Sequence, residues 1–182
     1  MKKISMKWLV IILLIFTGSA LPALVKAQDE KDTRVMDDSK NAKAEFMKTD
    51  KLMQALFDRS YGYVIFPNVG KGAVGVGGAA GSGTVYEKGK AVGAAKMIQV
   101  TVGAQLGGQA YREVVFFENK EALDRFREGK FEFAAQTSAV AVKSGASANA
   151  KYADGVMVFT QEKGGLMYEA SVGGQKFSYT AF

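Results

Sequence analysis

The chain contains no cysteine and no histidine among its 182 residues. Without cysteine it has no disulfide framework, no thiol nucleophile and no attachment point for the lipid of a bacterial lipoprotein. Without histidine it lacks the side chain that most often acts as a general base or a metal ligand. No spacing of serine, lysine or acidic residues replaces that chemistry. The sequence therefore favours a binding protein over an enzyme, and it predicts neither a metal site nor a cofactor.

Beyond residue 27, the chain also has no strong excess of positive or negative charge. The net charge is +6, but four of the 24 basic residues and none of the 18 acidic residues lie within residues 1–27. Residues 28–182 therefore carry 20 basic and 18 acidic side chains. This balance does not fit a strongly basic domain that binds nucleic acid. The length of this part suffices for one domain with a sizeable buried core.

Residues 1–27 have the three parts of a secretory signal peptide. The basic start MKKISMK is followed by the apolar run WLVIILLIF, and the segment ends in Val25, Lys26 and Ala27. The apolar run is short for a membrane span, and the order of the parts predicts cleavage after Ala27. An uncleaved anchoring helix is the alternative. We therefore expect export to the periplasm or the exterior, with or without association with a membrane.

Residues 28–59 are predicted to be helical. A first apolar stripe follows spacings of four, three and four residues and consists of Val35, Ser39, Ala42 and Phe46. Thr49 or Asp50 is expected to cap a second helix. The apolar face of this second helix consists of Leu52, Met53, Leu56 and Phe57. Both stripes have the period of a helix that packs on a core.

Residues 60–182 are predicted to form strands. The segment YGYVIF reads as a strand that stops at Pro67 and Asn68. A long strand is expected over residues 73–84, with one face almost bare of side chains, and a turn over residues 87–90. The segment ENKEALDRFREG reads as one short helix, capped by Asn119 and ended by Gly129. The sequence predicts an α+β fold, in which a strongly curved, barrel-like antiparallel sheet of about seven strands joins N-terminal helices and one inserted short helix.

The glycine-rich stretch of residues 62–83 invites a second interpretation, because GVGGAA at residues 75–80 fits the dinucleotide-binding pattern G-x-G-x-x-A. That pattern has its meaning only between a strand and a helix. Here Gly81, Ser82 and Gly83 follow, and the next residues read as strand. The glycines are therefore expected to serve the geometry of the sheet.

Three segments resemble the SYLF domain family. They are GYVIFPNVGKGAVGVGGAAGSGTVY, GAQLGGQAYREVVFFENKEALDRF and GLMYEASVGGQKFSY, and they follow one another as in that family. The resemblance extends from about residue 35 to the end of the chain. It implies one SYLF-like domain over residues 28–182, with a helical part at 28–59 and a β-rich part at 60–182.

The resemblance also implies a lipid-binding protein. Eukaryotic members bind phosphoinositides, some yeast relatives bind actin, and exported bacterial members are similar to this chain. Membrane contact in the family is attributed to an amphipathic helix and basic residues near the N-terminus. In this sequence, that contact is expected to involve Lys40, Lys43, Phe46, Met47, Lys48 and Lys51.

Two further lysines are candidates from their positions alone. Lys71 follows the expected turn at Pro67, where it is able to reach a charged surface. Lys96 interrupts a run of apolar residues at even positions, which includes Val92 and Ile98. A lysine on an apolar face has to reach water, pair with a carboxylate or face a ligand.

We therefore expect a non-enzymatic protein that associates with anionic, phosphoinositide-like lipids or membrane surfaces. The alternative is a structural or protein-interaction module of the cell envelope that meets a protein partner through a sheet edge or the glycine-rich face. An enzyme would need a carboxylate cluster in a deep pocket, which no pattern in the sequence indicates. No nucleic acid is expected as a partner.

Overall fold

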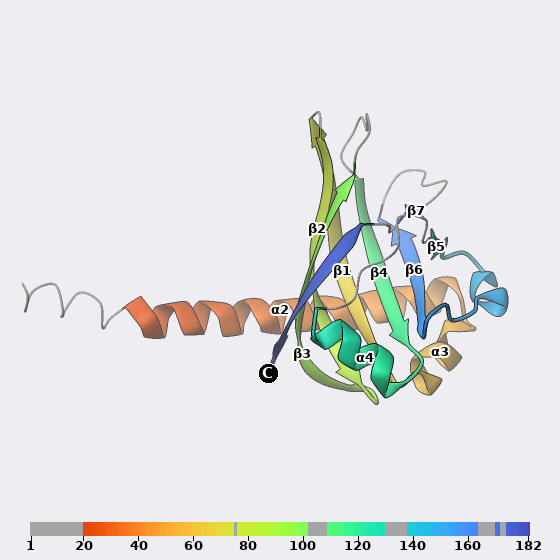
Figure 1. The fold of residues 1–182 in the computed structure, drawn as a ribbon, viewed down its shortest axis with the longest axis horizontal. Coiled ribbons are helices and arrows are strands. Elements are labelled where there is room, and N and C mark those ends of the chain that lie inside the picture. Colours follow the sequence, from red (N-terminus) through yellow and green to blue (C-terminus); the bar gives the residue numbers. More distant parts are fainter. Residues whose placement is uncertain (1–19, 75, 102–108, 130–137, 164–169, 172–173) are drawn as a thin grey trace, which may run out of the picture. The chain divides into compact units, whose positions relative to one another are not determined.

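The computed structural model describes residues 20–182 apart from residues 75, 102–108, 130–137, 164–169 and 172–173 (Figure 1). The chain divides into two compact units, Met1–Arg34 and Val35–Phe182. The expected signal peptide falls mostly on residues 1–19, outside the described residues. The candidate sites discussed below belong to the second unit unless stated otherwise.

Three α-helices, one short 3₁₀ helix and eight strands make up the described part of the chain. The helices are α2 (Ala20–Thr49), α3 (Met53–Arg59), α4 (Lys120–Arg127) and η1 (Ala146–Asn149). The strands are β1 (Gly62–Val74), β2 (Val76–Glu87), β3 (Lys90–Thr101), β4 (Gln109–Phe117), β5 (Ser138–Ala141), β6 (Val156–Glu162), β7 (Ala170–Ser171) and β8 (Gln175–Ala181). The α+β class, the N-terminal helices and the inserted helix were all predicted from the sequence.

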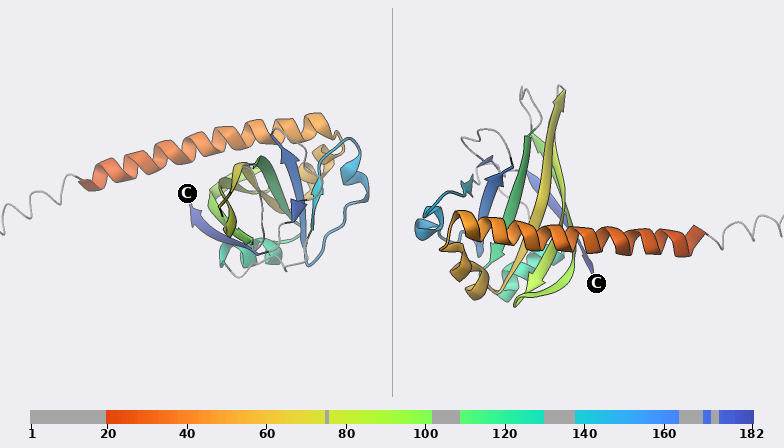
Figure 2. Two further views of the ribbon diagram at one scale, coloured as in Figure 1. Left: turned by 90° about the horizontal axis from the view of Figure 1, so that it is seen from above. Right: turned by 180° about the vertical axis from the view of Figure 1, so that it is seen from behind.

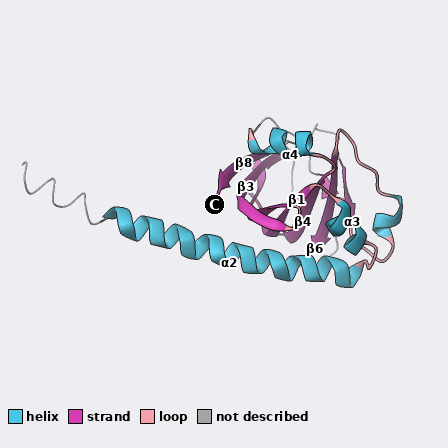
Figure 3. Ribbon diagram, turned by 90° about the horizontal axis from the view of Figure 1, so that it is seen from below, coloured by secondary structure: helices cyan, strands magenta, loops and turns pink. Residues whose placement is uncertain are grey.

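The strands form one sheet in the order β7-β5-β6-β4-β1-β2-β3-β8. The pairing of β5 with β6 is parallel and the other described pairings are antiparallel, so the expectation of a purely antiparallel sheet was wrong at this edge. The segment between β5 and β6 includes η1, and a parallel pair requires such a crossover. The sheet curves strongly (Figure 3). It is not closed, so the barrel-like form expected from the sequence is not confirmed.

The curve brings distant strands together across its inner face. The Gln175 side-chain amide of β8 donates a hydrogen bond to Glu113 of β4 at 2.9 Å, although three strands separate β4 from β8 in the sheet. The ring of Phe177 of β8 likewise contacts two other rings in tilted arrangements, with centroids 5.8 Å from Phe66 of β1 and 5.2 Å from Phe126 of α4. These contacts enclose an inner core that α4 covers.

A second core lies on the outer face of the sheet, under α3 and the part of α2 that belongs to the second unit (Figure 2). Residues of β1 alternate between the two cores, as the pleat requires. Val64 and Phe66 point to the inner core, whereas Tyr63 and Ile65 point to the outer one. Phe46 completes the outer core from α2 and is fully buried.

The apolar stripe of α2 is confirmed, with Ser39, Ala42 and Phe46 buried and Val35 partly buried. Ser39 also donates a hydrogen bond from Oγ to the Ile65 carbonyl at 3.3 Å. In α3, Met53 and Phe57 are buried as predicted, but Leu52 is 51% exposed.

Two predicted strand boundaries were wrong. The first strand does not stop at Pro67, because β1 continues to Val74 with a register shift between Ile65 and Asn68. A bulge accommodates a proline that has no N–H to donate. The expected long strand over residues 73–84 begins later than predicted, because β1 ends at Val74 and β2 covers Val76–Glu87, with Val74 paired to Val76.

Other local predictions are confirmed. Lys88 and Gly89 connect β2 to β3 with φ values of 48° and 78°, as a two-residue hairpin turn of type I′ requires. The Asn119 side chain caps α4 by accepting a hydrogen bond from the Ala122 N–H at 3.0 Å. Gly129, with φ of 66°, follows the last turn of α4. Among the described residues, no helix is long and apolar enough to cross a membrane.

Candidate functional site

Lys40 and Lys48 are exposed on α2, as the sequence predicted, but each lies beside an acidic side chain. Lys40 pairs with Asp37 at 2.9 Å and Lys48 pairs with Glu45 at 3.8 Å. Because these pairs are open to water, each contributes little to stability. Both lysines remain accessible, and the carboxylates reduce the positive charge around them.

Lys43 packs against side chains of the outer core. Its ammonium group lies 4.7 Å from the centre of the Phe57 ring and 5.2 Å from that of Tyr63, and it donates a hydrogen bond to the Tyr63 hydroxyl at 3.2 Å. Burial lowers the pKa of Lys43, and the nearby Asp58 partly opposes this effect. The side chain therefore contacts two aromatic rings of the outer core.

The two apolar residues expected to contact lipid are turned towards the outer core. Phe46 is 0% exposed, and Met47 is partly buried against the same cluster. The α-helical period explains this, because Phe46 lies one turn after Ala42 on the stripe that faces the sheet. Phe46 therefore does not reach the surface, contrary to its expected role in membrane contact.

Of the two lysines predicted from their positions alone, the structure describes the side chain of Lys96 but not that of Lys71. The side chain of Lys71 lies outside the described residues. On β3 the odd positions, including Ala95 and Met97, are buried and Lys96 is exposed, so the apolar even face is the outward one. Its neighbour Ile98 is 56% exposed. Lys96 thus reaches water without interrupting a buried face.

The structure assembles a basic corner where α2 ends and α3 begins. Asp50, in the turn, accepts hydrogen bonds from the Ser147 N–H at 2.8 Å, the Ser147 hydroxyl at 2.7 Å and the Leu52 N–H at 3.1 Å. Burial by itself would raise the pKa of Asp50, but these hydrogen bonds outweigh it and lower the pKa. The corner is therefore held by a buried carboxylate that stays ionised.

We call the exposed residues around this turn the corner surface, which consists of Lys48, Lys51, Leu52 and Lys143. Lys143 belongs to the loop that carries Ser147, and the contact with Asp50 brings that loop to the turn. Within the described part of the chain, neither Lys51 nor Lys143 has a carboxylate within ion-pair distance. An exposed leucine thus follows Lys48 and Lys51 closely in the chain, at a turn that contacts the loop of Lys143.

A hollow lies beside α3, between this helix and the segment before β6. We call it the α3 hollow, and its volume is about 490 Å³. Leu56, Ala150 and Met157 form its apolar part. Leu52 directly precedes α3 and Leu56 lies one helical turn later, so the α3 hollow follows the corner surface along this helix.

The polar side chains of the α3 hollow come from three parts of the chain. They are Arg59 at the end of α3, Glu118 after β4, and Lys151 and Tyr152 before β6. Burial, and to a smaller extent Glu118, raises the pKa of Tyr152, which keeps its hydroxyl protonated. The described part of the lining therefore carries two cations and one carboxylate.

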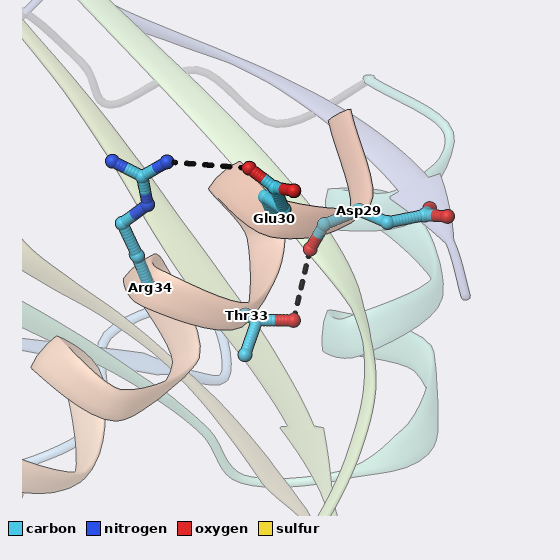
Figure 4. Close-up of a pocket in the computed structure, with 4 residues that line it drawn as sticks. All are labelled: Asp29, Glu30, Thr33 and Arg34. Atoms are coloured by element: carbon cyan, nitrogen blue, oxygen red, sulfur yellow. Dashed lines mark hydrogen bonds and ion pairs between the residues drawn. The ribbon is translucent and has the colours of Figure 1, made fainter. Parts of the chain in front are cut away.

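A second hollow lies on α2 in the first unit, beside Asp29, Glu30, Thr33 and Arg34 (Figure 4). Its polar groups bond to each other, since Arg34 lies 3.7 Å from Glu30 and Thr33 donates to the Asp29 carbonyl at 2.9 Å. All four of the described residues that line it come from one stretch of helix. In the described residues, no three acidic side chains gather in a way that would hold a metal ion.

The residues that sequence reasoning missed lie in the loops and at the end of α3. Arg59 carried a readable signal, because Leu52, Leu56 and Arg59 follow helical spacings of four and three. Lys143 and Lys151 carried none, because only the tertiary fold brings them to α2 and α3. The structure thus leaves Lys48 and Lys51 exposed, puts Lys43 against two rings of the outer core and buries Phe46 in that core.

Comparisons with known proteins give two matches to this sequence. Residues 98–180 match the family model Ysc84, described as Las17-binding protein actin regulator. The chain is also similar to Beta cell expansion factor A from Aeromonas veronii, with 31% identity over 132 residues. The similar region covers 67% of this chain and 47% of that relative, so the chain spans about half the length of the curated relative.

Proposed function

Since this chain belongs to the SYLF (Ysc84) family, we propose that it is an exported, non-enzymatic protein that associates with anionic membrane lipids through the corner surface. The observation that carries the proposal is the exposed side chain of Leu52. It projects from a turn fixed by Asp50 and has Lys48 and Lys51 as close neighbours in sequence. An exposed apolar side chain with lysines close to it in the chain suits the boundary between lipid head groups and acyl chains.

The expected strength is moderate. A lysine near an anionic surface contributes about 1 kcal/mol, so Lys48, Lys51 and Lys143 together contribute roughly 3 kcal/mol. Burying the exposed half of Leu52 adds roughly 1 kcal/mol. Glu45 beside Lys48 reduces the sum. Binding on this scale is reversible and weakens as salt screens the charges.

The test is flotation of the protein of residues 28–182, which includes the whole compact unit Val35–Phe182, with anionic and zwitterionic vesicles at low and high salt. The expected result is binding to anionic vesicles that high salt reduces. Combined substitutions Lys51→Glu and Lys143→Glu should abolish most of this binding, and Leu52→Asp should weaken it.

The matched control is Lys90→Glu, because Lys90 is exposed at the β2–β3 turn and carries the same charge. Lys43→Met should also leave binding unchanged, since that ammonium group contacts two rings of the outer core. Two results would contradict the proposed mechanism. One is equal binding to anionic and zwitterionic vesicles, and the other is unchanged binding when Lys51→Glu and Lys143→Glu are combined.

The second candidate is a protein-interaction module, which the description of the matched family as a binding protein favours. The specific observation is Ile98, which is 56% exposed on the outward face of β3 beside Lys96. Transfer of such an apolar side chain from water into an interface with a protein partner is favourable. Stable capture of one protein that Ile98→Asp abolishes, together with no vesicle binding, would favour this candidate over lipid association.

A further inference from the structure

The α3 hollow has features that association with a flat membrane does not require. Its floor is apolar, since Met157 is only 5% exposed and Leu56 is partly buried against the outer core. Its volume of about 490 Å³ falls in the range of roughly 300–1,000 Å³ typical of small-molecule sites. The floor is therefore suited to an alkyl chain.

The cations that line the α3 hollow have no acidic ion-pair partner in the described part of the chain. Within the described residues, no carboxylate lies within ion-pair distance of Arg59 or Lys151. Glu118, the one acidic side chain among the described lining residues, makes no such pair with a described residue either. A guanidinium group offers a fork of donors that matches the oxygens of a carboxylate or a phosphate.

We propose that the α3 hollow binds a single-chain amphipathic anion, with its carboxylate or phosphate on Arg59 and Lys151 and its alkyl chain against Leu56 and Met157. This inference goes beyond the proposed function, because it concerns one soluble molecule in a hollow and needs no membrane. A cationic ligand does not fit, because it would meet two cations and only one carboxylate.

The experiment is isothermal titration of the protein of residues 28–182 with four probes that share a ten-carbon chain. Decanoate and decyl phosphate test the two anionic ends, decanol tests the chain alone, and decyltrimethylammonium tests the opposite charge. All probes are used as monomers. The expected result is saturable binding of both anions, at least tenfold weaker binding of decanol, and no binding of the ammonium probe. Hexanoate should bind more weakly than decanoate, because its shorter chain buries less apolar surface.

Substitutions locate the site. Arg59→Gln and Lys151→Gln should each weaken decanoate binding about tenfold, which corresponds to about 1.4 kcal/mol. Glu118→Gln should strengthen it about twofold to fivefold, because it removes a repulsive charge. Both basic residues are exposed, so the variants are expected to fold. Lys90→Gln is the matched control and should bind as the parent does. The methyl resonance of Met157 should shift on addition of decanoate.

Equal binding of decanol and decanoate, or unchanged binding in Arg59→Gln and Lys151→Gln, would overturn the proposal. The result of the decanoate titration can be distinguished from the result of vesicle flotation. The pair Lys51→Glu and Lys143→Glu should impair vesicle binding and leave decanoate affinity within twofold of the parent. Decanoate binding without vesicle binding would refute membrane association alone, and the reverse result would refute the α3 hollow alone.

Discussion

At the scale of single residues, Asp50 determines where the end of α2 meets the loop before β6. It is 1% exposed and accepts three hydrogen bonds, two from Ser147 and one from the Leu52 N–H. A buried carboxylate of this kind is stable only because its hydrogen bonds offset the loss of hydration. The corner surface, including the position of Leu52, therefore depends on one ionised side chain.

Asp50→Asn should lower the free energy of unfolding by about 1–3 kcal/mol at neutral pH, because hydrogen bonds to a charged acceptor are replaced by weaker ones. The pKa of Asp50 lies below its ordinary value of 3.8 in the folded state. Its stabilisation is therefore complete above that value and is lost as the pH falls through the folded pKa. The difference between parent and variant in urea unfolding should shrink below pH 3.8.

Asp58→Asn is the control for that measurement. Asp58 is exposed and accepts a hydrogen bond from the Gln54 side chain at 2.9 Å within α3. Its loss should change stability by less than about 0.5 kcal/mol. A deficit of Asp50→Asn that stays constant with pH would show that the carboxylate charge contributes nothing.

At the scale of elements, the glycines of the β1–β2 hairpin have unequal importance. A Cβ atom at Gly83 would lie 2.5 Å from the Ile65 carbonyl oxygen and 2.7 Å from the Phe66 ring. This crowding sits next to the bulge that lets β1 pass Pro67. A Cβ atom at Gly70 would meet nothing within 4 Å. Gly83 is therefore required by close approach, and Gly70 is not.

Gly83→Ala should destabilise the protein by about 1–3 kcal/mol, because the neighbouring backbone has to shift. Gly70→Ala should be neutral or stabilising by up to about 1 kcal/mol, since alanine loses less entropy on folding. Thermal unfolding of the two variants checks this contrast. Equal effects at the two positions would mean that the hairpin adapts freely and that the close approach at Gly83 carries no cost.

At the scale of the whole second unit, β1 is the strand on which both cores depend. It pairs with β2 and β4 and sends Val64 and Phe66 to the inner core and Tyr63 and Ile65 to the outer one. By contrast, β8 lies at one end of the strand order and has exposed side chains at alternate positions. The centre of the sheet should therefore open last.

Native-state hydrogen exchange should show this order directly. Amides of residues 62–66 should exchange only through global unfolding, with the highest protection in the chain. Amides of β5 and β8 should exchange through smaller openings that cost less free energy. Protection in β8 equal to that of β1 would contradict the order and would indicate that the inner core makes the whole curved sheet one cooperative unit.

The sequence by itself determined the features that depend on near neighbours in the chain. The apolar stripe of α2, the turn at Lys88 and Gly89, and the caps of α4 at Asn119 and Gly129 were predicted correctly. Each follows from the hydrogen bonds or side-chain spacing of a few consecutive residues. The expectation of lipid contact at Lys48 and Lys51 also came from the sequence, and the structure leaves both lysines exposed.

Only the tertiary structure decided which face of each strand is buried and which basic side chains line the same surface. The two-residue period of β3 could not tell its inner from its outer face, because both of its faces carry small or apolar residues. In the sequence, Lys43 does not differ from the other lysines of α2, and only the structure shows its ammonium group against the rings of Phe57 and Tyr63. Arg59 and Lys151 line one hollow although 92 residues separate them in the chain. Such groupings depend on long-range packing, which local spacing does not encode.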